Sequence, residues 1–239
     1  MPNAIFPQKY RILSGSALKL IAILSMFIDH AAIILSREAA WMLMPFLSFA
    51  GREITAYYLM RKIGRLAFPI FCFLIAEGMS HTKNQKQYGL RLLLFALISE
   101  IPFNLLVSGQ LICGTKQNVY FTLVLGALMI WIFENVKTAL PKALCMGATA
   151  VLTVFLCTDY SLNGVLLIFL LYLLRNQPAV QAILSYPLLS GGIAAFAAFL
   201  PINLYNGKRG FIRSPFWKFF FYAFYPLHIL LLVLLQQLI

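Results

Sequence analysis

Residues 18–36 read LKLIAILSMFIDHAAIILS, an almost unbroken apolar run. Apart from Lys19, no charged residue occurs in it before Asp29. About 20 mainly apolar residues suffice for an α-helix to cross the hydrocarbon core of a bilayer. A cleaved signal peptide has a shorter apolar core that ends at a small-residue cleavage site, and none is recognisable here. The run therefore predicts a retained membrane helix with an ionisable pair, Asp29 and His30, inside it.

The whole chain has the composition of a membrane protein. Of its 239 residues 62% are hydrophobic and 11% charged, and the mean hydropathy is +0.85. Soluble domains are about 45–50% apolar and about 25% charged. Membrane β-barrels show short strands of alternating polarity, which this sequence lacks. These observations predict an all-α fold, a polytopic transmembrane bundle of 8–9 helices.

The chain reads as one domain, residues 1–239. We expect eight spans, at 18–36, 66–80, 89–107, 119–135, 143–158, 161–174, 182–202 and 218–238. The stretch 37–65 is ambiguous, being either an interfacial hairpin or a ninth span. Interfacial segments carry Trp, Tyr and basic residues in this manner, whereas the distribution of Lys and Arg between the loops favours nine crossings.

The net charge of +12 has two readings in a membrane protein. Lys and Arg flank membrane spans, where they meet anionic headgroups of the lipid bilayer. A basic mouth can also hold an anionic substrate. Nucleic acid is not an expected partner. The seven acidic residues are too few and too scattered for a dedicated metal site, so we expect no metal.

Asp29 and His30 are the first candidates for chemistry. A charge inside a membrane costs about 2.5 kcal/mol or more, and such residues usually mark function. Neighbours on a helix point about 100° apart, so each of the two needs its own partner on another segment. A neutral imidazole takes up a proton near neutral pH and can act as a general base. The alternative is a hydrogen bond that only holds helices together.

Other polar residues have a functional and a structural reading as well. Arg65 either binds an anion or extends to the interface. Glu77 and His81 share a helix face, so a local hydrogen bond is as good an explanation as catalysis. Asp159 is well placed to cap the helix that follows it. His228 lies within the last span, where packing competes with function.

Nucleotide-binding loops and the common hydrolase signatures are absent from the sequence, among them G-x-x-x-x-G-K-[ST], G-x-G-x-x-G, H-E-x-x-H and G-x-S-x-G.

Several blocks in fixed order resemble one family of bacterial membrane proteins. They are 18–22 with Asp29-His30, 63–71 with Glu77-Gly78, 81–84, Tyr88 with Arg91-Leu92, 101–104, Asn118 with 121–123, Asp159-Tyr160, 206–210, and 221–228. Together they cover most of the chain and resemble the TraX family, named for a protein that acetylates the N-terminus of conjugative pilin. The stretch 37–62 departs from that pattern and looks like an insertion.

The resemblance implies a multi-pass enzyme of the bacterial cytoplasmic membrane that transfers acetyl from acetyl-CoA. It implies that Asp29 and His30 are the reactive pair. It also implies a surrounding set that lines the site or binds the donor: Arg65, Glu77, His81, Arg91, Asn118, Asp159 and His228. The acceptor, a peptide N-terminus or a glycan, is not fixed by it.

The resulting hypothesis has His30 as general base, Asp29 orienting it indirectly, and Asn118 or Arg65 stabilising an oxyanion. Acetyl-CoA would dock at a basic mouth made of Lys208, Arg209 and Arg213. Two alternatives stay open at this point. One is a proton-coupled transporter that uses Asp29, His30 and Glu77 as a relay, and the other is a non-catalytic membrane scaffold.

Overall fold

Each long helix begins at a residue that caps it. Ser14, Asn84 and Ser214 precede the helices α1 (Gly15–Glu38), α4 (Gln85–Ser108) and α11 (Pro215–Gln236). Each of these three side chains accepts a hydrogen bond from a backbone N–H in the first turn, where no helical carbonyl is available. The computed structural model describes residues 5–49, 51–212 and 214–238.

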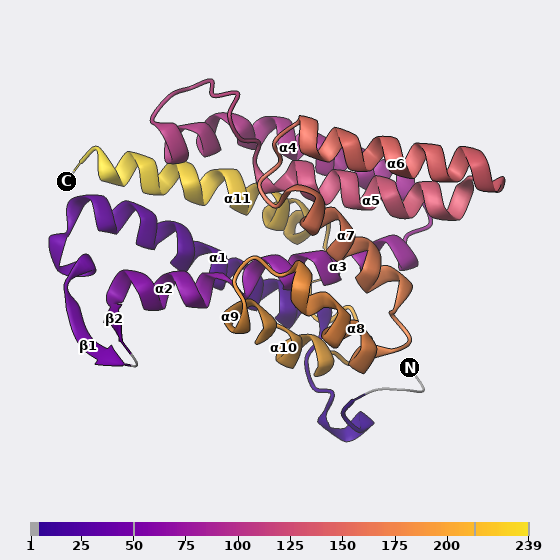
Figure 1. Ribbon diagram of the computed structural model, residues 1–239, viewed down its shortest axis with the longest axis horizontal. Helices are drawn as coiled ribbons and strands as arrows, with labels where there is room; N and C mark the ends of the chain where they lie inside the picture. The colour runs from indigo at the N-terminus through magenta and orange to yellow at the C-terminus, as the bar shows by residue number, and fades with distance from the viewer. Residues whose placement is uncertain (1–4, 50, 213, 239) are drawn as a thin grey trace.

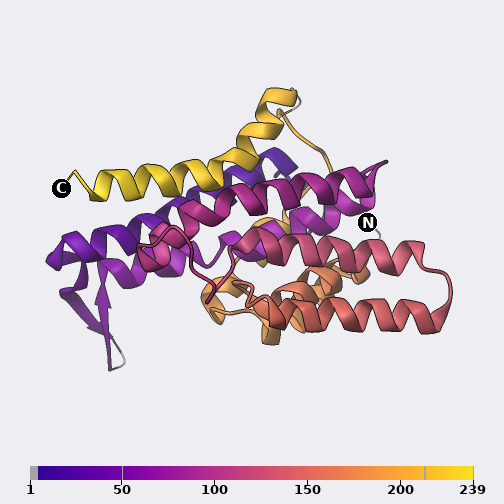
Figure 2. The same cartoon turned by 90° about the horizontal axis from the view of Figure 1, so that it is seen from above.

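The three long helices run parallel to one another (Figures 1 and 2). Near the end of α1, Arg37 donates to the carbonyl of Leu106 in α4 at 2.8 Å, and Gln236 of α11 donates to Glu38 at 2.8 Å. The carboxyl ends of all three therefore meet at one end of the bundle. Of the helices in the described residues, these three are long and apolar enough to cross a membrane.

Shorter helices and one β-hairpin connect the three long helices. The helices of intermediate length are α3 (Ala67–His81), α5 (Val119–Asn135), α6 (Ala139–Phe155) and α7 (Ser161–Leu173). The short helices are η1 (Gln8–Tyr10), η2 (Ala40–Leu43), α2 (Ala56–Gly64), α8 (Pro178–Ser185), η3 (Tyr186–Leu188), α9 (Ile193–Phe196) and α10 (Phe199–Asn203). The strands β1 (Pro45–Phe49) and β2 (Arg52–Thr55) pair antiparallel, with Leu47 opposite Ile54.

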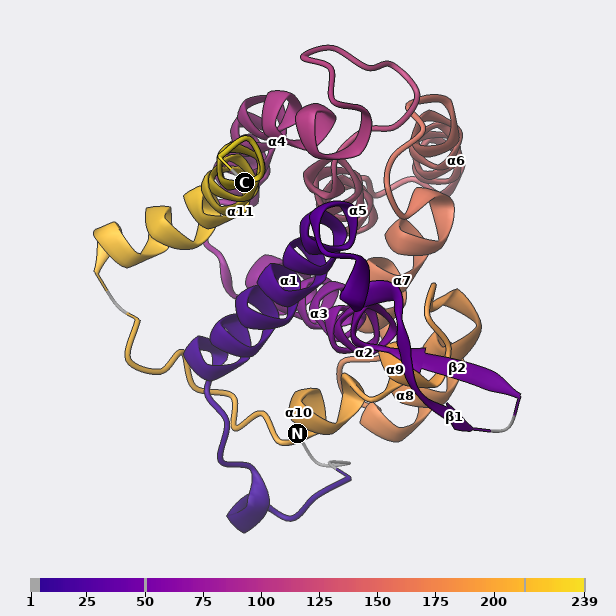
Figure 3. The ribbon, with the colours of Figure 1, turned by 90° about the vertical axis from the view of Figure 1, so that its left-hand side faces the viewer.

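The core lies around α3, which α1, α5 and α7 surround (Figure 3). Fully buried Ile70, Leu18 and Ile168 belong to its main cluster. Gly126 lets α5 approach α7, because a Cβ there would lie 2.4 Å from the side chain of Ile168. α6 packs at the edge and leaves apolar side chains such as Phe155, 81% exposed, on the outside. Lipid is a suitable solvent for that face.

The predicted all-α membrane bundle is confirmed, with two differences in its segments. The predicted span 182–202 is not one helix but α8, η3, α9 and α10. Pro187 and Gly192, whose φ is +58°, interrupt an apolar run that composition alone makes look continuous.

The stretch 37–65 forms η2, the β-hairpin and α2 instead of a ninth spanning helix. The hairpin projects from the bundle (Figure 1), and all residues of β1 are exposed. The nine residues of α2 are too few to span a bilayer, and only Arg65 and Leu66 separate this helix from α3.

Candidate functional site

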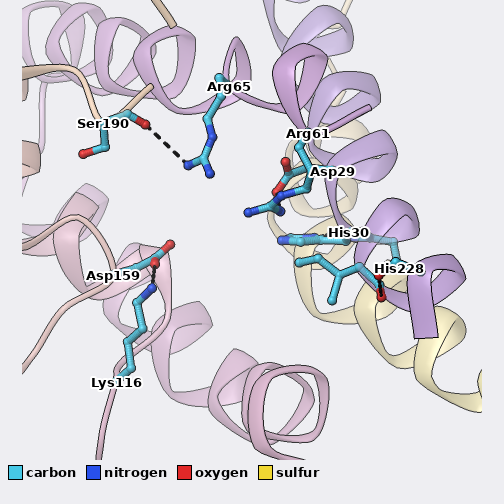
Figure 4. A network of polar contacts seen from close by, with 10 residues as sticks. Asp29, His30, Arg61, Arg65, Lys116, Asp159, Ser190 and His228 are labelled. Carbon is cyan, nitrogen blue, oxygen red and sulfur yellow. Dashed lines mark hydrogen bonds and ion pairs between the residues drawn. The ribbon is translucent and has the colours of Figure 1, made fainter. Parts of the chain in front are cut away.

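Asp29 and His30 lie midway along α1 and contact different elements, as their spacing predicts. Asp29 Oδ2 accepts a hydrogen bond from Arg61 of α2 at 2.5 Å. His30 Nδ1 lies 2.7 Å from Nε2 of His228 in α11. Figure 4 shows the two pairs side by side. One turn of α1 thus joins α2 on one face and α11 on the other.

The Asp29–Arg61 contact depends on a glycine. A Cβ built at Gly64 would lie 2.1 Å from Asp29 Oδ1. The last turn of α2 can approach the carboxylate only because no side chain stands there. The second oxygen of Asp29, Oδ1, is buried and has no hydrogen-bond partner among the described residues. This oxygen faces the backbone of α2 at Gly64.

The tautomers of the two histidines follow from their partners. His228 Nδ1 lies 2.6 Å from the carbonyl of Phe224, which can only accept, so Nδ1 carries a proton. In the neutral pair His228 Nε2 is then an acceptor, and His30 Nδ1 must donate to it. The remaining ring nitrogen, His30 Nε2, carries a lone pair. Within the described ranges it has no hydrogen-bond partner, so it is available as a base.

Aromatic side chains enclose the histidine pair. The rings of His30 and His228 are nearly parallel, with centroids 5.0 Å apart. Phe224 stacks on His228 at 4.8 Å, and Tyr225 lies edge-on to His30 at 5.9 Å. His228 is 4% exposed. These rings fix the orientation of both imidazoles and keep water away from the bond between them.

A proline in α11 helps to place this cage. Pro226 lacks the N–H that would bond to the carbonyl of Tyr222 four residues earlier. That carbonyl instead accepts a hydrogen bond from the hydroxyl of Tyr120 in α5 at 2.9 Å. Tyr120 in turn packs edge-on against Tyr225 at 5.3 Å. The Pro residue thus ties α11 to α5 beside the histidines.

A second group of charges lies across the site. Asp159 pairs with Lys116 at 2.6 Å, and Arg65 donates to the carbonyl of Ser190 at 3.4 Å. Arg65 and Asp159 both act electrostatically on the carboxylate of Asp29. In Figure 4 these side chains lie on the other side of the site from the histidine pair. The structure therefore gathers Asp29, His30, Arg65, Asp159 and His228 at one place.

The expected capping role of Asp159 is wrong. Tyr160 is the N-cap of α7, and the helix start has no side-chain cap hydrogen bond. The carboxylate of Asp159 is used by Lys116 instead.

Asn118 does not serve as the expected oxyanion donor. It caps α5, and its amide nitrogen donates to the carbonyl of Ala96 at 2.8 Å and to Glu100 at 2.6 Å. The amide has two N–H groups, and both are used. Asn118 is also fully buried, so a substrate cannot reach it. Its function here is to join α4 to α5.

Glu77, His81 and Arg91 lie away from the histidine pair. Glu77 and His81 approach to 3.6 Å at the end of α3, where the His81 side chain is 71% exposed. This is the local pair that the spacing allows. Arg91 lies over the ring of Tyr88 at 5.8 Å, inside the contact between α4 and α11.

The basic mouth at Lys208 and Arg209 is also remote. The carbonyls of these two residues accept hydrogen bonds from Gly15 and Ser16, both at 2.9 Å, at the beginning of α1. From there to His30 the helix extends for about 20 Å. Arg213, the third residue of the expected mouth, lies outside the described residues. In the part of the chain that the structure describes, no three His, Cys, Asp or Glu side chains gather at a metal site.

Sequence reasoning missed two residues of the site, Arg61 and Lys116. Arg61 lies in the stretch 37–62, which departs from the family pattern, and so was not among the predicted site residues. The one feature of the sequence that could have identified Arg61 is its position, three residues before the Gly64-Arg65 block that resembles the family. Lys116 lies in the loop before α5, and only the fold brings it to Asp159.

Comparison with known proteins agrees with the resemblance noted above. The family model described as TraX protein matches residues 14–236. A similar protein is the probable fimbrial assembly protein FimC, serogroup H1, of Dichelobacter nodosus. It is 29% identical over 247 aligned positions, which cover 92% of this chain and 94% of that protein. No solved structure matches the chain. Because the family model extends over nearly the whole sequence, the chain belongs to the TraX family.

Proposed function

We propose that this protein is a multi-pass acyltransferase of the bacterial cytoplasmic membrane that transfers acetyl from acetyl-CoA to an amine or hydroxyl. The observation that carries the proposal is the chain of contacts from the Phe224 carbonyl through His228 to His30. This chain leaves a lone pair on His30 Nε2. It resembles the arrangement in which one buried group fixes the tautomer of a catalytic histidine.

The reaction uses the histidine as a proton carrier. His30 Nε2 removes a proton from the acceptor as its nitrogen or oxygen bonds to the carbonyl carbon of the thioester. The C–S bond then breaks, and the thiolate leaves with the proton from His30, which gives free CoA and the acetylated acceptor. Through both steps His30 Nδ1–H stays bonded to His228. The charge that develops on the carbonyl oxygen needs a donor nearby.

Arg65 is the donor that the geometry favours for that oxygen. Its only hydrogen bond in the described residues is the long one to Ser190, and it takes part in no ion pair there. Arg61, in contrast, is bound to Asp29. Asp29 thus holds α2 in place and bonds to Arg61 rather than to His30, so any effect on the imidazole passes through Arg61, as the expected indirect role requires.

The acceptor is proposed to be the terminal amine of a surface-fibre subunit. The support comes from the relative named as a fimbrial assembly protein and from the name of the family. A glycan hydroxyl is the competing acceptor, which the same base would serve.

The test measures CoA thiol release from acetyl-CoA by the purified protein in lipid nanodiscs. Acceptors are a peptide with a free N-terminus, the same peptide already acetylated, and an oligosaccharide. We expect release with one free acceptor, and a loss of about 10²–10⁴-fold in His30→Ala. Cys145→Ala is the control, because it removes an exposed side chain of α6, a helix that contributes no residue to the site.

Wild-type rates in His30→Ala would overturn the assignment of the base. Proton-coupled substrate flux into liposomes, with no thiol release from any acceptor, would replace the transferase by the transporter.

A further inference from the structure

The end of the bundle where α4 begins is strongly cationic. Gln85 of α4 and Tyr172 of α7 both donate to Glu134 near the end of α5, so these three helix ends meet there. Five cations lie around these helix ends, on or against the same segments: Lys83, Lys86, Lys137, Lys142 and Arg175. At the opposite end, where the long helices finish, Arg37 and Glu38 balance each other. The positive-inside rule assigns the cationic end to the cytoplasm.

A groove of about 470 Å³ opens at this end, between the α3–α4 connection and the last turn of α5. Its lining is polar and includes Lys83, Lys86, Gln85, Glu134 and Asn135, with Trp131 as its aromatic wall. Ligand sites commonly fall between about 300 and 1,000 Å³, so the groove has a suitable size for a small organic ligand.

Both oxygens of the carboxylate in the groove already accept hydrogen bonds, whereas neither lysine is paired with a carboxylate among the described residues. Glu134 accepts hydrogen bonds from Gln85 and Tyr172, one on each oxygen. The ammonium group of Lys86 lies 5.5 Å from the centre of the Trp131 ring, and neither Lys83 nor Lys86 belongs to an ion pair within the described residues. The groove therefore offers two positive charges, and a ring that stacks on Trp131 takes the place that the Lys86 ammonium occupies over the indole.

We propose that this groove binds the phosphorylated nucleotide end of the acyl donor from the cytoplasm. This inference rests on the proposed function. The two lysines bind phosphate oxygens, and the face of Trp131 stacks on the base, since every base offers a π-face. The amide N–H groups of Gln85 and Asn135 are all used within the protein, so the base is held by its face and not by its edge. A lipid headgroup would use the same lysines, but it has no ring to stack.

The position of the groove fits a donor that is bound at one end and reacts at the other. Gly64 packs against Asp29, and the helical path from there to His81, beside the groove, is about 25 Å long. An acyl-CoA carries its nucleotide and its thioester at opposite ends of a long arm. With the nucleotide in the groove, an arm of about this length is needed to bring the thioester to His30.

Calorimetry on the full chain in phosphatidylcholine nanodiscs tests the proposal, with adenosine 3′,5′-bisphosphate as the probe. This molecule has the nucleotide but no thioester. We expect Lys83→Gln/Lys86→Gln and Trp131→Ala each to weaken binding about tenfold or more, and Trp131→Phe to keep most of it. The matched control is Lys137→Gln/Lys142→Gln, which removes the same charge from the same end outside the groove.

Two results would overturn the assignment. One is unchanged binding in the groove variants together with a loss in Lys208→Ala/Arg209→Ala. The other is nucleotide binding that phosphatidylglycerol nanodiscs abolish in wild type and that the aromatic variants do not change, which would identify a headgroup site.

Thiol release, measured in parallel, separates this proposal from the proposed function. Normal release at every acetyl-CoA concentration in Lys83→Gln/Lys86→Gln would refute the groove and leave the transferase intact. Nucleotide binding that depends on the groove, in a protein that transfers acetyl to no acceptor, would refute the transferase and leave a cytoplasmic nucleotide site.

Discussion

The substitution Gly64→Ala tests how tightly α2 is held against α1 at Asp29. The new Cβ would lie 2.1 Å from Oδ1 of Asp29, 2.4 Å from its Cβ and 2.5 Å from its Cγ. Carbon contacts are comfortable only near 3.5–4.0 Å, so α1 and α2 must separate by more than about 1 Å. Overpacking of this kind typically costs about 1–3 kcal/mol. Part of the Asp29–Arg61 contact is lost as well.

Equilibrium unfolding in mixed detergent micelles, followed by circular dichroism, measures this cost. Gly147→Ala is the control, because a Cβ at Gly147 meets no atom within 4 Å. As Gly147 lies inside α6, its replacement should leave stability unchanged or raise it by up to about 1 kcal/mol. A Gly64→Ala protein within about 0.5 kcal/mol of wild type would show that the α1–α2 approach at Asp29 is wrong.

Three further predictions concern single contacts. His228→Phe keeps an aromatic ring but removes the acceptor for His30, so acetyl transfer should fall by about 10²–10⁴-fold; an unchanged rate would refute the relay. Arg61→Gln should lower the free energy of unfolding by about 1–3 kcal/mol, since the pair with Asp29 is only partly exposed. Adding Asp29→Asn should restore most of this loss, and no recovery would mean that the pair does not couple. Hydrogen bonds from Thr115 lower the pKa of the Cys113 thiol, which lies in the loop after α4. Its alkylation by iodoacetamide should therefore reach half-maximal rate at a lower pH than an ordinary thiol, and Thr115→Ala should raise that midpoint; equal midpoints would contradict the contact.

Local signals in the sequence were enough to locate most helices. The predicted span 119–135 agrees with α5 at both ends, because Asn118 is a strong cap and the apolar run stops at Glu134. The stretch 182–202 has the same apolar content but bends at Gly192. Hydropathy averages over such a residue, whereas a positive φ at one position is enough to end a helix. A hairpin was one of the two readings of 37–65, but its strands were not predicted, because Phe46 and Phe49 are apolar yet exposed.

The site was predictable in its residue types and not in its pairings. An ionisable pair deep in an apolar helix is costly, which singled out Asp29 and His30. Their partners were beyond reach, since His228 is 198 residues away from His30 and only the fold brings them together. Arg61 was overlooked, although a buried carboxylate implies a cation close by. Asn118 shows the opposite error, for a polar residue at a helix start is more often a cap than a catalyst.

The neighbouring positions of Asp29 and His30 let the two side chains bind different helices without any contact between them. Asp29 binds Arg61, which anchors α2 through a charged pair that Gly64 allows to close. His30 faces about 100° away and bonds to His228, whose tautomer the carbonyl of Phe224 fixes. Loss of the carboxylate should thus loosen α2 and leave the histidine relay assembled. Loss of His228 should free His30 to change its tautomer in a bundle that is otherwise intact. Substitution of Asp29 should therefore lower the free energy of unfolding, whereas substitution of His228 should change the protonation of His30 and leave the free energy of unfolding nearly unchanged.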